Sequence, residues 1–92
     1  MSNSLYGTFS VTKIMEPYAV ISLQNGNHED ILMIPRRLDY KGQKYGFDVD
    51  DVVVIHKDNN KTLFTFDIST TDEVDAVTMT VDATGRFIPY TK

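Results

Sequence analysis

The sequence predicts a small all-β protein, a five-stranded barrel followed by a β-hairpin at its C-terminal end. Segments rich in Val, Ile, Phe and Thr recur at short intervals. Several alternate apolar and polar residues with the period of a half-buried strand, and compact turn signals separate them. Short strands spaced in this way are typical of barrels. We expect the barrel strands at Tyr6–Ile14, Tyr18–Gln24, Asp30–Ile34, Asp51–His56 and Thr62–Ile68.

The first expected strand has the alternation of a strand with one buried face. Gly7, Phe9 and Val11 fall on one side of it, and small hydroxyl residues fall on the other. Pro17 has no N–H to donate to a strand ladder, so we expect the strand to end in a turn there.

The second and third expected strands form a hairpin. Alternate residues from Ala19 to Leu23 are apolar, and Asn25-Gly26 follows directly. Asn-Gly favours a type I′ turn because both residues tolerate positive φ angles. Pro35 ends the third strand.

The middle of the chain is less regular. Arg36–Phe47 shows no sustained period, and we expect a loop with at most one helical turn. Val52–Ile55 is an unbroken apolar and β-branched run, which favours a strand covered on both faces. Lys57–Lys61 supplies the turn into the fifth strand.

The C-terminal segment predicts a second hairpin, formed by Ala76–Val81 and Arg86–Tyr90. Gly85 suits the left-handed position after a type I turn. An isolated hairpin is only marginally stable in water, so we expect this one to dock on the barrel or on a partner. An uncovered strand edge at 86–91 also offers a route to a homodimer by strand addition.

Length and composition are those of one globular domain. The chain has 92 residues, of which 41% are hydrophobic and 24% are charged. This is enough for one core and too little for a second. We expect a single domain over residues 1–92, with the barrel at 6–68 and the hairpin at 76–91.

The absence of cysteine excludes disulfides, thiolate nucleophiles and metal sites that need thiolates. The first residues show no basic cluster followed by an apolar run. No stretch reaches the roughly 18 apolar residues that span a bilayer. We expect a cytoplasmic protein that does not bind membranes.

Three stretches carry a family resemblance: Gly7-Thr8-Phe9, Ile21-Ser22-Leu23-Gln24-Asn25-Gly26 and Asp50-Asp51-Val52-Val53-Val54. With the order of strands and turns, they resemble the S1 and bacterial initiation-factor-one branch of the OB-fold over residues 6–68. The resemblance implies a five-stranded OB-like barrel that binds single-stranded RNA on its second and third strands. An SH3-like barrel is the alternative architecture.

Charge is unevenly distributed along the chain. The formal net charge is −4, which argues against a surface that attracts nucleic acid everywhere. Residues 1–61 hold seven basic and eight acidic side chains, net −1, and residues 62–92 hold two basic and five acidic ones, net −3. We expect any phosphate-binding surface in the first two-thirds.

The leading functional hypothesis is weak, salt-sensitive binding of single-stranded RNA or DNA by a basic and aromatic loop. Positive groups attract phosphate and tyrosine rings stack on bases. Tyr18 on the second strand, with Lys13 and Lys57 nearby, extends this surface. The alternative is a solvated loop whose tyrosines pack against the barrel mouth. The candidate loop residues are Arg36, Arg37, Tyr40, Lys41, Lys44 and Tyr45.

A second hypothesis is an acidic protein-interaction or inhibitor module. A line of carboxylates imitates the charge of nucleic-acid phosphates and can occupy a basic cleft on a partner protein. The simpler alternative is that these residues keep the protein soluble. The candidates are Asp67, Asp72, Glu73, Asp75 and Asp82.

No motif predicts catalysis, a metal site or a cofactor. His28 and His56 lack the spacing of paired metal-binding histidines. Asp48, Asp50 and Asp51 contain only the first part of a calcium-loop pattern and fit a turn before a strand. We therefore expect a binding protein, not an enzyme.

Overall fold

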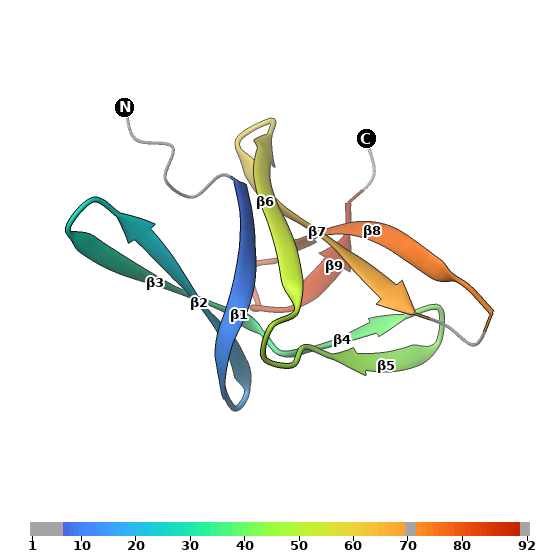
Figure 1. Cartoon of the computed structure of the whole chain (residues 1–92). Coiled ribbons are helices and arrows are strands. Elements are labelled where there is room, and N and C mark those ends of the chain that lie inside the picture. Colours follow the sequence, from blue (N-terminus) through green and yellow to red (C-terminus); the bar gives the residue numbers. More distant parts are fainter. Residues whose placement is uncertain (1–6, 70–71, 91–92) are drawn as a thin grey trace.

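The computed structural model describes residues 7–69 and 72–90, in which every regular element is a β-strand (Figure 1). The all-β class is therefore confirmed. Tyr6, the expected start of the first strand, and Thr91, the expected end of the C-terminal hairpin, lie outside the described residues. The strands are β1 (Gly7–Met15), β2 (Tyr18–Asn25), β3 (His28–Pro35), β4 (Arg37–Tyr40), β5 (Gln43–Gly46), β6 (Val52–Asp58), β7 (Lys61–Ser69), β8 (Val74–Val81) and β9 (Phe87–Pro89).

The segments that the sequence predicts as strands are strands in the structure. The five expected barrel strands are β1, β2, β3, β6 and β7, and the expected C-terminal hairpin is β8 with β9. Their bounds agree with the expected ones to within about two residues, the usual uncertainty at element ends.

Seven strands form one antiparallel sheet in the order β3-β2-β1-β6-β7-β8-β9. β1 connects the two parts of this sheet, because residues 7–10 pair with β6 and the rest of the strand pairs with β2. The register shifts between Val11 and Lys13, and a bulge of this kind bends a strand. The return of the chain from β3 to a position beside β1 is a Greek-key connection.

The sheet does not close into a barrel within the described chain. Its two edges are β3 and β9, and no described strand joins them. β7 takes β8 as its second neighbour, so the C-terminal hairpin continues the sheet past β7. The expected closed five-stranded barrel is therefore not found.

Arg36–Phe47 is not the loop that the sequence predicts. β4 and β5 pair along their whole length, and Lys41 and Gly42 connect them with φ angles of 51° and 78°, as in a type I′ turn. The expectation of a loop is wrong because each strand has only four residues, too few for a period to be recognised.

The β2–β3 turn is shifted by one residue from the expected one. Asn25 pairs with His28, so the loop residues are Gly26 and Asn27, and of these two only Gly26 has a positive φ, 64°. This is a type II′ turn with glycine first, not a type I′ turn centred on Asn25-Gly26. The sequence signal predicts the hairpin correctly and its register wrongly.

The β4–β5 hairpin and the segment after it cover the inner face of the sheet. Phe47 packs against Phe66 with ring centroids 4.8 Å apart, and Phe64 packs against Phe87 at 5.6 Å. The rest of the core comes from the inward side chains of the sheet and from Leu38: Val11, Ala19, Ile21, Leu23, Ile34, Leu38, Val53, Ile55, Ile68, Val77 and Met79.

The β-branched run of β6 is buried on one face only. Val53 and Ile55 are in the core, whereas Val52 and Val54 are 53% and 37% exposed. The expectation of a strand covered on both faces is wrong, because no described element packs over the outer face of β6.

Candidate binding surfaces

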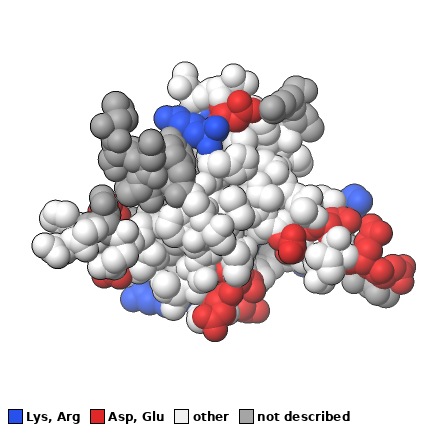
Figure 2. Space-filling model, turned by 45° about the horizontal axis from the view of Figure 1, so that its top comes forward, with Lys and Arg blue, Asp and Glu red and all other residues white. Residues whose placement is uncertain are grey.

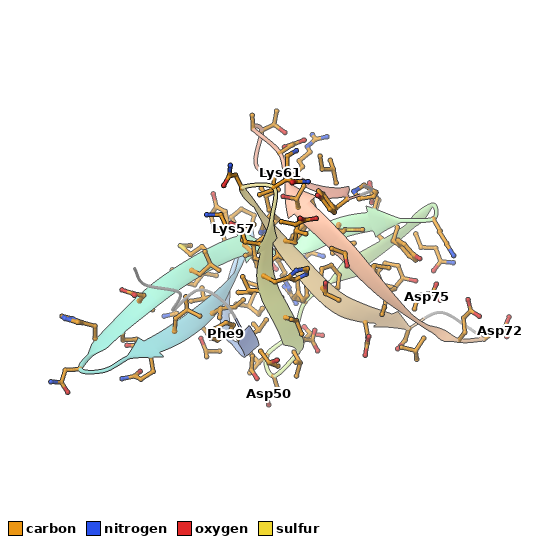
Figure 3. All side chains as sticks on the ribbon, turned by 90° about the horizontal axis from the view of Figure 1, so that it is seen from above. Phe9, Asp50, Lys57, Lys61, Asp72 and Asp75 are labelled. Atoms are coloured by element: carbon orange, nitrogen blue, oxygen red, sulfur yellow. The ribbon has the colours of Figure 1, made fainter. Side chains whose placement is uncertain are left out.

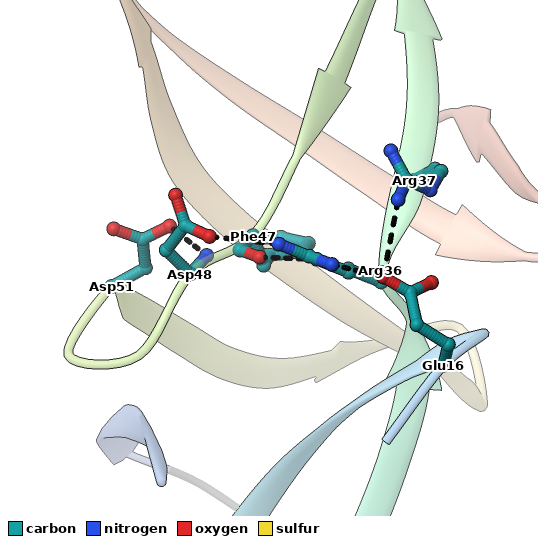
Figure 4. Close-up of polar contacts among 6 residues, drawn as sticks. All are labelled: Glu16, Arg36, Arg37, Phe47, Asp48 and Asp51. Atoms are coloured by element: carbon teal, nitrogen blue, oxygen red, sulfur yellow. Dashed lines mark hydrogen bonds and ion pairs between the residues drawn. The ribbon is translucent and has the colours of Figure 1, made fainter. Parts of the chain in front are cut away.

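Arg36, the first residue of the predicted basic loop, joins three segments of the fold (Figure 4). Its Nε donates a hydrogen bond to the carbonyl oxygen of Phe47 at 2.9 Å, and its two terminal nitrogens donate to Asp48 Oδ1, also at 2.9 Å, and to Glu16. Arg37 binds the same Glu16 oxygen at 3.1 Å. Only 22% of the Arg36 side chain is exposed, so this residue holds two turns together.

These contacts shift the titration of the paired groups. The hydrogen bond from Arg36 lowers the pKa of Glu16 against the opposing effect of desolvation, and the charges of Arg36 and Arg37 lower it further. The hydrogen bonds to Glu16 and then Asp48 raise the pKa of Arg36. Glu16 is therefore held in its ionised form.

The tip of the β4–β5 hairpin is joined to β8. The hydroxyl of Tyr40 donates to Asp75 Oδ2 at 3.2 Å, and Lys41 Nζ donates to the same oxygen at 3.5 Å. Lys41 Nζ also lies 5.2 Å from the centroid of the Tyr40 ring. Tyr40 and then Asp75 raise the pKa of Lys41, which favours the charged form of this amine.

Every cation of the predicted basic loop has a carboxylate partner. The last of the four, Lys44, lies 3.4 Å from Asp39. Glu16, Asp48 and Asp75, which offset the positive charge, come from outside the loop. The two tyrosines, Tyr40 and Tyr45, are partly buried and pack against the core. The structure therefore brings the predicted residues together on one hairpin with their charge neutralised.

Tyr18 lies on a different surface, the outer face of β1, β2 and β3. It is 43% exposed and faces Met15, which is 47% exposed. Lys13 on β1 and Met33 on β3 lie on either side of the β2 residue two positions after Tyr18. The expectation that Lys57 lies near Tyr18 is wrong, because Lys57 lies at the far end of β6, beyond the start of β1.

Four of the five predicted acidic residues gather at the end of the β7–β8 hairpin. Asp67 lies on β7 and Asp75 on β8, and Asp72 and Glu73 directly precede β8. Figure 3 shows Asp72 and Asp75 at this end, away from the two lysines of the β6–β7 turn. We call these four residues the acidic end.

Asp82 lies at the opposite end of β8 and has a structural role. Its Oδ1 accepts hydrogen bonds from Thr84 N at 2.9 Å, Thr84 Oγ1 at 2.6 Å and Arg86 N at 3.0 Å. The bonds from Thr84 and Arg86 lower the pKa of Asp82. Asp82 thus fixes the β8–β9 turn, in which Gly85 has the expected positive φ, 86°.

The sequence did not predict the exposed and mostly uncharged face of the sheet that continues into the acidic end. Val52 and Val54 project from it on β6, and Val74 on β8 is 62% exposed. Figure 2 shows a broad uncharged area with acidic side chains at its border. The pairing places Asp67 on the same face, opposite Ala76, and the other neighbours of these valines are small and neutral: Thr8, Ser10, Thr65, Ala76 and Thr78. We call this surface the valine face.

A groove of about 430 Å³ connects the valine face to the acidic end and to the β4–β5 hairpin. It opens where β6 and β7 separate, beyond the Val54–Thr65 pair. Val52 and Asp67 line the groove from the sheet, and Tyr45 lines it from the β4–β5 hairpin. The groove therefore offers apolar, aromatic and acidic groups together.

His56 and the turn carboxylates form local contacts. His56 Nε2 lies 3.0 Å from Thr65 Oγ1, and His28 is exposed at the start of β3. Asp51 Oδ2 accepts a hydrogen bond from Asp48 N at 2.8 Å, which stabilises the turn before β6. Within residues 7–69 and 72–90, no three His, Asp or Glu side chains form a group that could hold a metal ion.

Comparisons of the chain with protein-family models, with curated proteins and with solved structures gave no match. In the part of the chain that the structure describes, no helix is long and apolar enough to cross a membrane. A functional proposal therefore depends on the geometry of the surfaces above.

Proposed function

We propose that this chain is a non-enzymatic module that binds another protein through the valine face and the acidic end. The observation that carries this proposal is the juxtaposition of the two surfaces. Val52, Val54 and Val74 expose apolar surface, and the carboxylates of Asp67 and Asp72 lie beside it. The partner surface that fits is apolar opposite the valines and basic opposite Asp67 and Asp72.

The two surfaces contribute in different ways. Burying the exposed valines stabilises a complex by about 25 cal/mol per Å² of apolar area, and exposed apolar patches with a polar border are typical of interaction sites. The carboxylates attract a basic partner and orient it. Asp67 and Asp72 supply this charge, since the carboxylate of Asp75 already binds Tyr40 and Lys41. A basic cleft that ordinarily holds nucleic acid is a suitable partner, because carboxylates resemble phosphates in charge.

The experiment is a pair of NMR titrations of the isotope-labelled protein, one with a peptide of alternating lysine and valine and one with an oligouridine RNA. We expect the peptide to shift the amide signals of β6, β7 and β8. Asp67→Lys with Asp72→Lys should weaken peptide binding by about tenfold or more, since both charges are reversed. The matched control, Glu29→Lys with Asp30→Lys, makes the same change of charge on the β2–β3 hairpin and should bind normally.

Two results would contradict the proposal. The first is peptide binding that both charge reversals weaken equally, because this indicates attraction by net charge alone. The second is an absence of shifts on β6 to β8 at low salt, where attraction between opposite charges is strongest.

Single-stranded nucleic acid is the second candidate ligand, favoured by the exposed Tyr18 on the outer face of β2, with Lys13 of β1 diagonally across from it. An OB-like origin of this face, also a proposal, is supported by the Greek-key order β3-β2-β1-β6. If a base stacks on Tyr18, Tyr18→Ala should cost about 1–3 kcal/mol of binding free energy. Fluorescence anisotropy of labelled single-stranded RNA at low and moderate salt measures this, with Val74→Ala as control. Unchanged affinity in Tyr18→Ala would exclude this face.

A further inference from the structure

The two edges of the sheet differ in how well they are protected against pairing with another strand. β9 has three residues, Phe87–Pro89, and its proline cannot donate a hydrogen bond. It is the strand within the 86–91 edge that the sequence predicts as a route to a homodimer. β3 has eight residues, His28–Pro35, with proline only at the last position. Short length and proline are the usual protections of an edge strand, so β3 is the open edge.

The register of the β2–β3 hairpin shows which backbone groups of β3 are unused. Arg36 N donates to Pro17 O at 3.0 Å, continuing the ladder of this hairpin, and hydrogen-bonded positions alternate along an antiparallel pair. The even-numbered residues of β3 therefore bond to β2. The N–H and C=O groups of Glu29, Ile31 and Met33 point to the outer edge, where no described strand pairs with them.

The exposed side chains of the same edge are apolar. Ile31 is 56% exposed and Met33 is 43% exposed, and they project from the same face because they are two positions apart. Figure 1 shows the β2–β3 hairpin extending away from the rest of the sheet, which leaves this part of the edge accessible. Unused backbone groups and exposed apolar side chains thus coincide.

We propose that a second copy of this chain occupies the edge, with the two β3 strands antiparallel across a two-fold axis at Leu32. In this register Ile31 of each copy lies opposite Met33 of the other copy. The two residues of each such pair exchange both backbone hydrogen bonds. Glu29 lies opposite the partner's Pro35, so carboxylates do not face each other. A shift that places Asp30 opposite its own copy brings like charges together, which is unfavourable.

The space beside β3 and the charge within it also favour a second copy. A groove of about 640 Å³ follows the edge from Leu32 to Pro35. Lys61 lines its other side, and the two-fold pairing brings the acidic start of the partner's strand into this groove. Asp82 also lines the groove, but its carboxylate already accepts hydrogen bonds from Thr84 and Arg86.

Sedimentation velocity over a range of concentrations tests the proposal, and we expect a reversible dimer. Ile31→Lys with Met33→Lys should weaken the dimer by about tenfold or more, because apolar pairs become like-charged pairs. Both side chains are exposed, so the monomer should stay folded. The matched control is Val74→Lys, an exposed apolar residue on β8, which should leave dimerisation unchanged while reducing the partner binding proposed above.

Cysteine cross-linking tests the register, since the natural chain has no cysteine. In the proposed dimer Leu32 and its copy form a non-hydrogen-bonded pair with Cα atoms about 4.5 Å apart, a distance that a disulfide spans. Leu32→Cys should therefore cross-link quickly under mild oxidation. Met33→Cys should not, because each copy lies two positions from the other.

Two results would overturn the proposal. One is a wild-type protein that stays monomeric at the highest soluble concentration, which would leave the edge to an extended segment of another protein. The other is a dimer that forms equally well in the double lysine variant, or that cross-links faster through Met33→Cys than through Leu32→Cys.

Discussion

Arg36 connects two turns that are distant in the sequence. Its guanidinium group binds Glu16 in the β1–β2 turn and Asp48 before β6, and its backbone carbonyl accepts a hydrogen bond from Phe47 N at 2.9 Å. A basic residue near other basic residues predicts phosphate binding only if its charge is free. The carboxylates that neutralise this one are 20 and 12 residues away, so local sequence could not show that Arg36 has a structural role.

The Glu16–Arg36 pair predicts sensitivity to acid. The pKa of Glu16 in the folded protein lies below its ordinary value of 4.5, so the folded state favours the ionised form. This group stabilises the protein above about pH 4.5, and the stabilisation is lost as the pH falls through the folded-state pKa. Glu16→Gln should therefore be less stable than wild type near neutral pH, and the difference should shrink in acid.

Urea unfolding at a series of pH values measures this effect as the difference in free energy of unfolding. Glu29→Gln is the matched control, because it removes a carboxylate from β3 without touching the Arg36 contacts. A difference between Glu16→Gln and wild type that stays constant from neutral to acidic pH would show that the ion pair does not control the titration.

The strands and turns differ in how well they can be predicted from the sequence. β1, β2, β3, β6 and β7 were predictable because alternation and turn residues are local properties of the chain. β4 and β5 were not, because four residues are too few to show a period and their packing partners, including β8, are distant in sequence. The outer face of β6 was missed because an unbroken β-branched run hides which residues point inward.

The β6–β7 turn gives a test at this scale. Asn59 and Asn60 both have positive φ angles, 53° and 67°, as a type I′ turn requires. Asn60→Gly should stabilise the protein by about 0.5–1 kcal/mol, because glycine adopts this conformation without strain. Asn60→Ala should destabilise it by about 1 kcal/mol, because a Cβ without a compensating polar group is strained there.

Denaturant midpoints of these variants check the prediction, with Asn27→Gly in the β2–β3 turn as control. Asn27 does not have a positive φ, so glycine there should destabilise by about 0.5 kcal/mol through the entropy of the unfolded chain. The same direction of change in Asn27→Gly and Asn60→Gly would contradict the turn assignment.

At the scale of the whole molecule, the C-terminal hairpin is part of the main sheet and of the core. The sequence predicts the hairpin itself, but whether it docks depends on contacts between residues far apart in the chain. β8 pairs with β7 from Phe64–Met79 to Ser69–Val74. This pairing gives β7 its second neighbour and leaves β3 as an edge, so an open sheet replaces the expected barrel.

Phe87 on β9 tests whether this hairpin is required for the stability of the whole domain. Its ring lies 6.1 Å from Phe47, 5.6 Å from Phe64 and 5.8 Å from Phe66, measured between centroids. Phe87→Ala should therefore cost about 2–4 kcal/mol, because it removes an aromatic ring from a cluster that joins the sheet to the β4–β5 hairpin. Ile88→Ala, the control, should cost less than about 1 kcal/mol, since Ile88 is 38% exposed.

Thermal unfolding followed by circular dichroism and by the amide signals of β1 distinguishes two outcomes. If both signals are lost together at a lower temperature in Phe87→Ala, the hairpin and the sheet unfold as one unit. If the β1 signals keep their wild-type transition, β1 to β7 are stable without the hairpin, and the C-terminal strands are a docked addition.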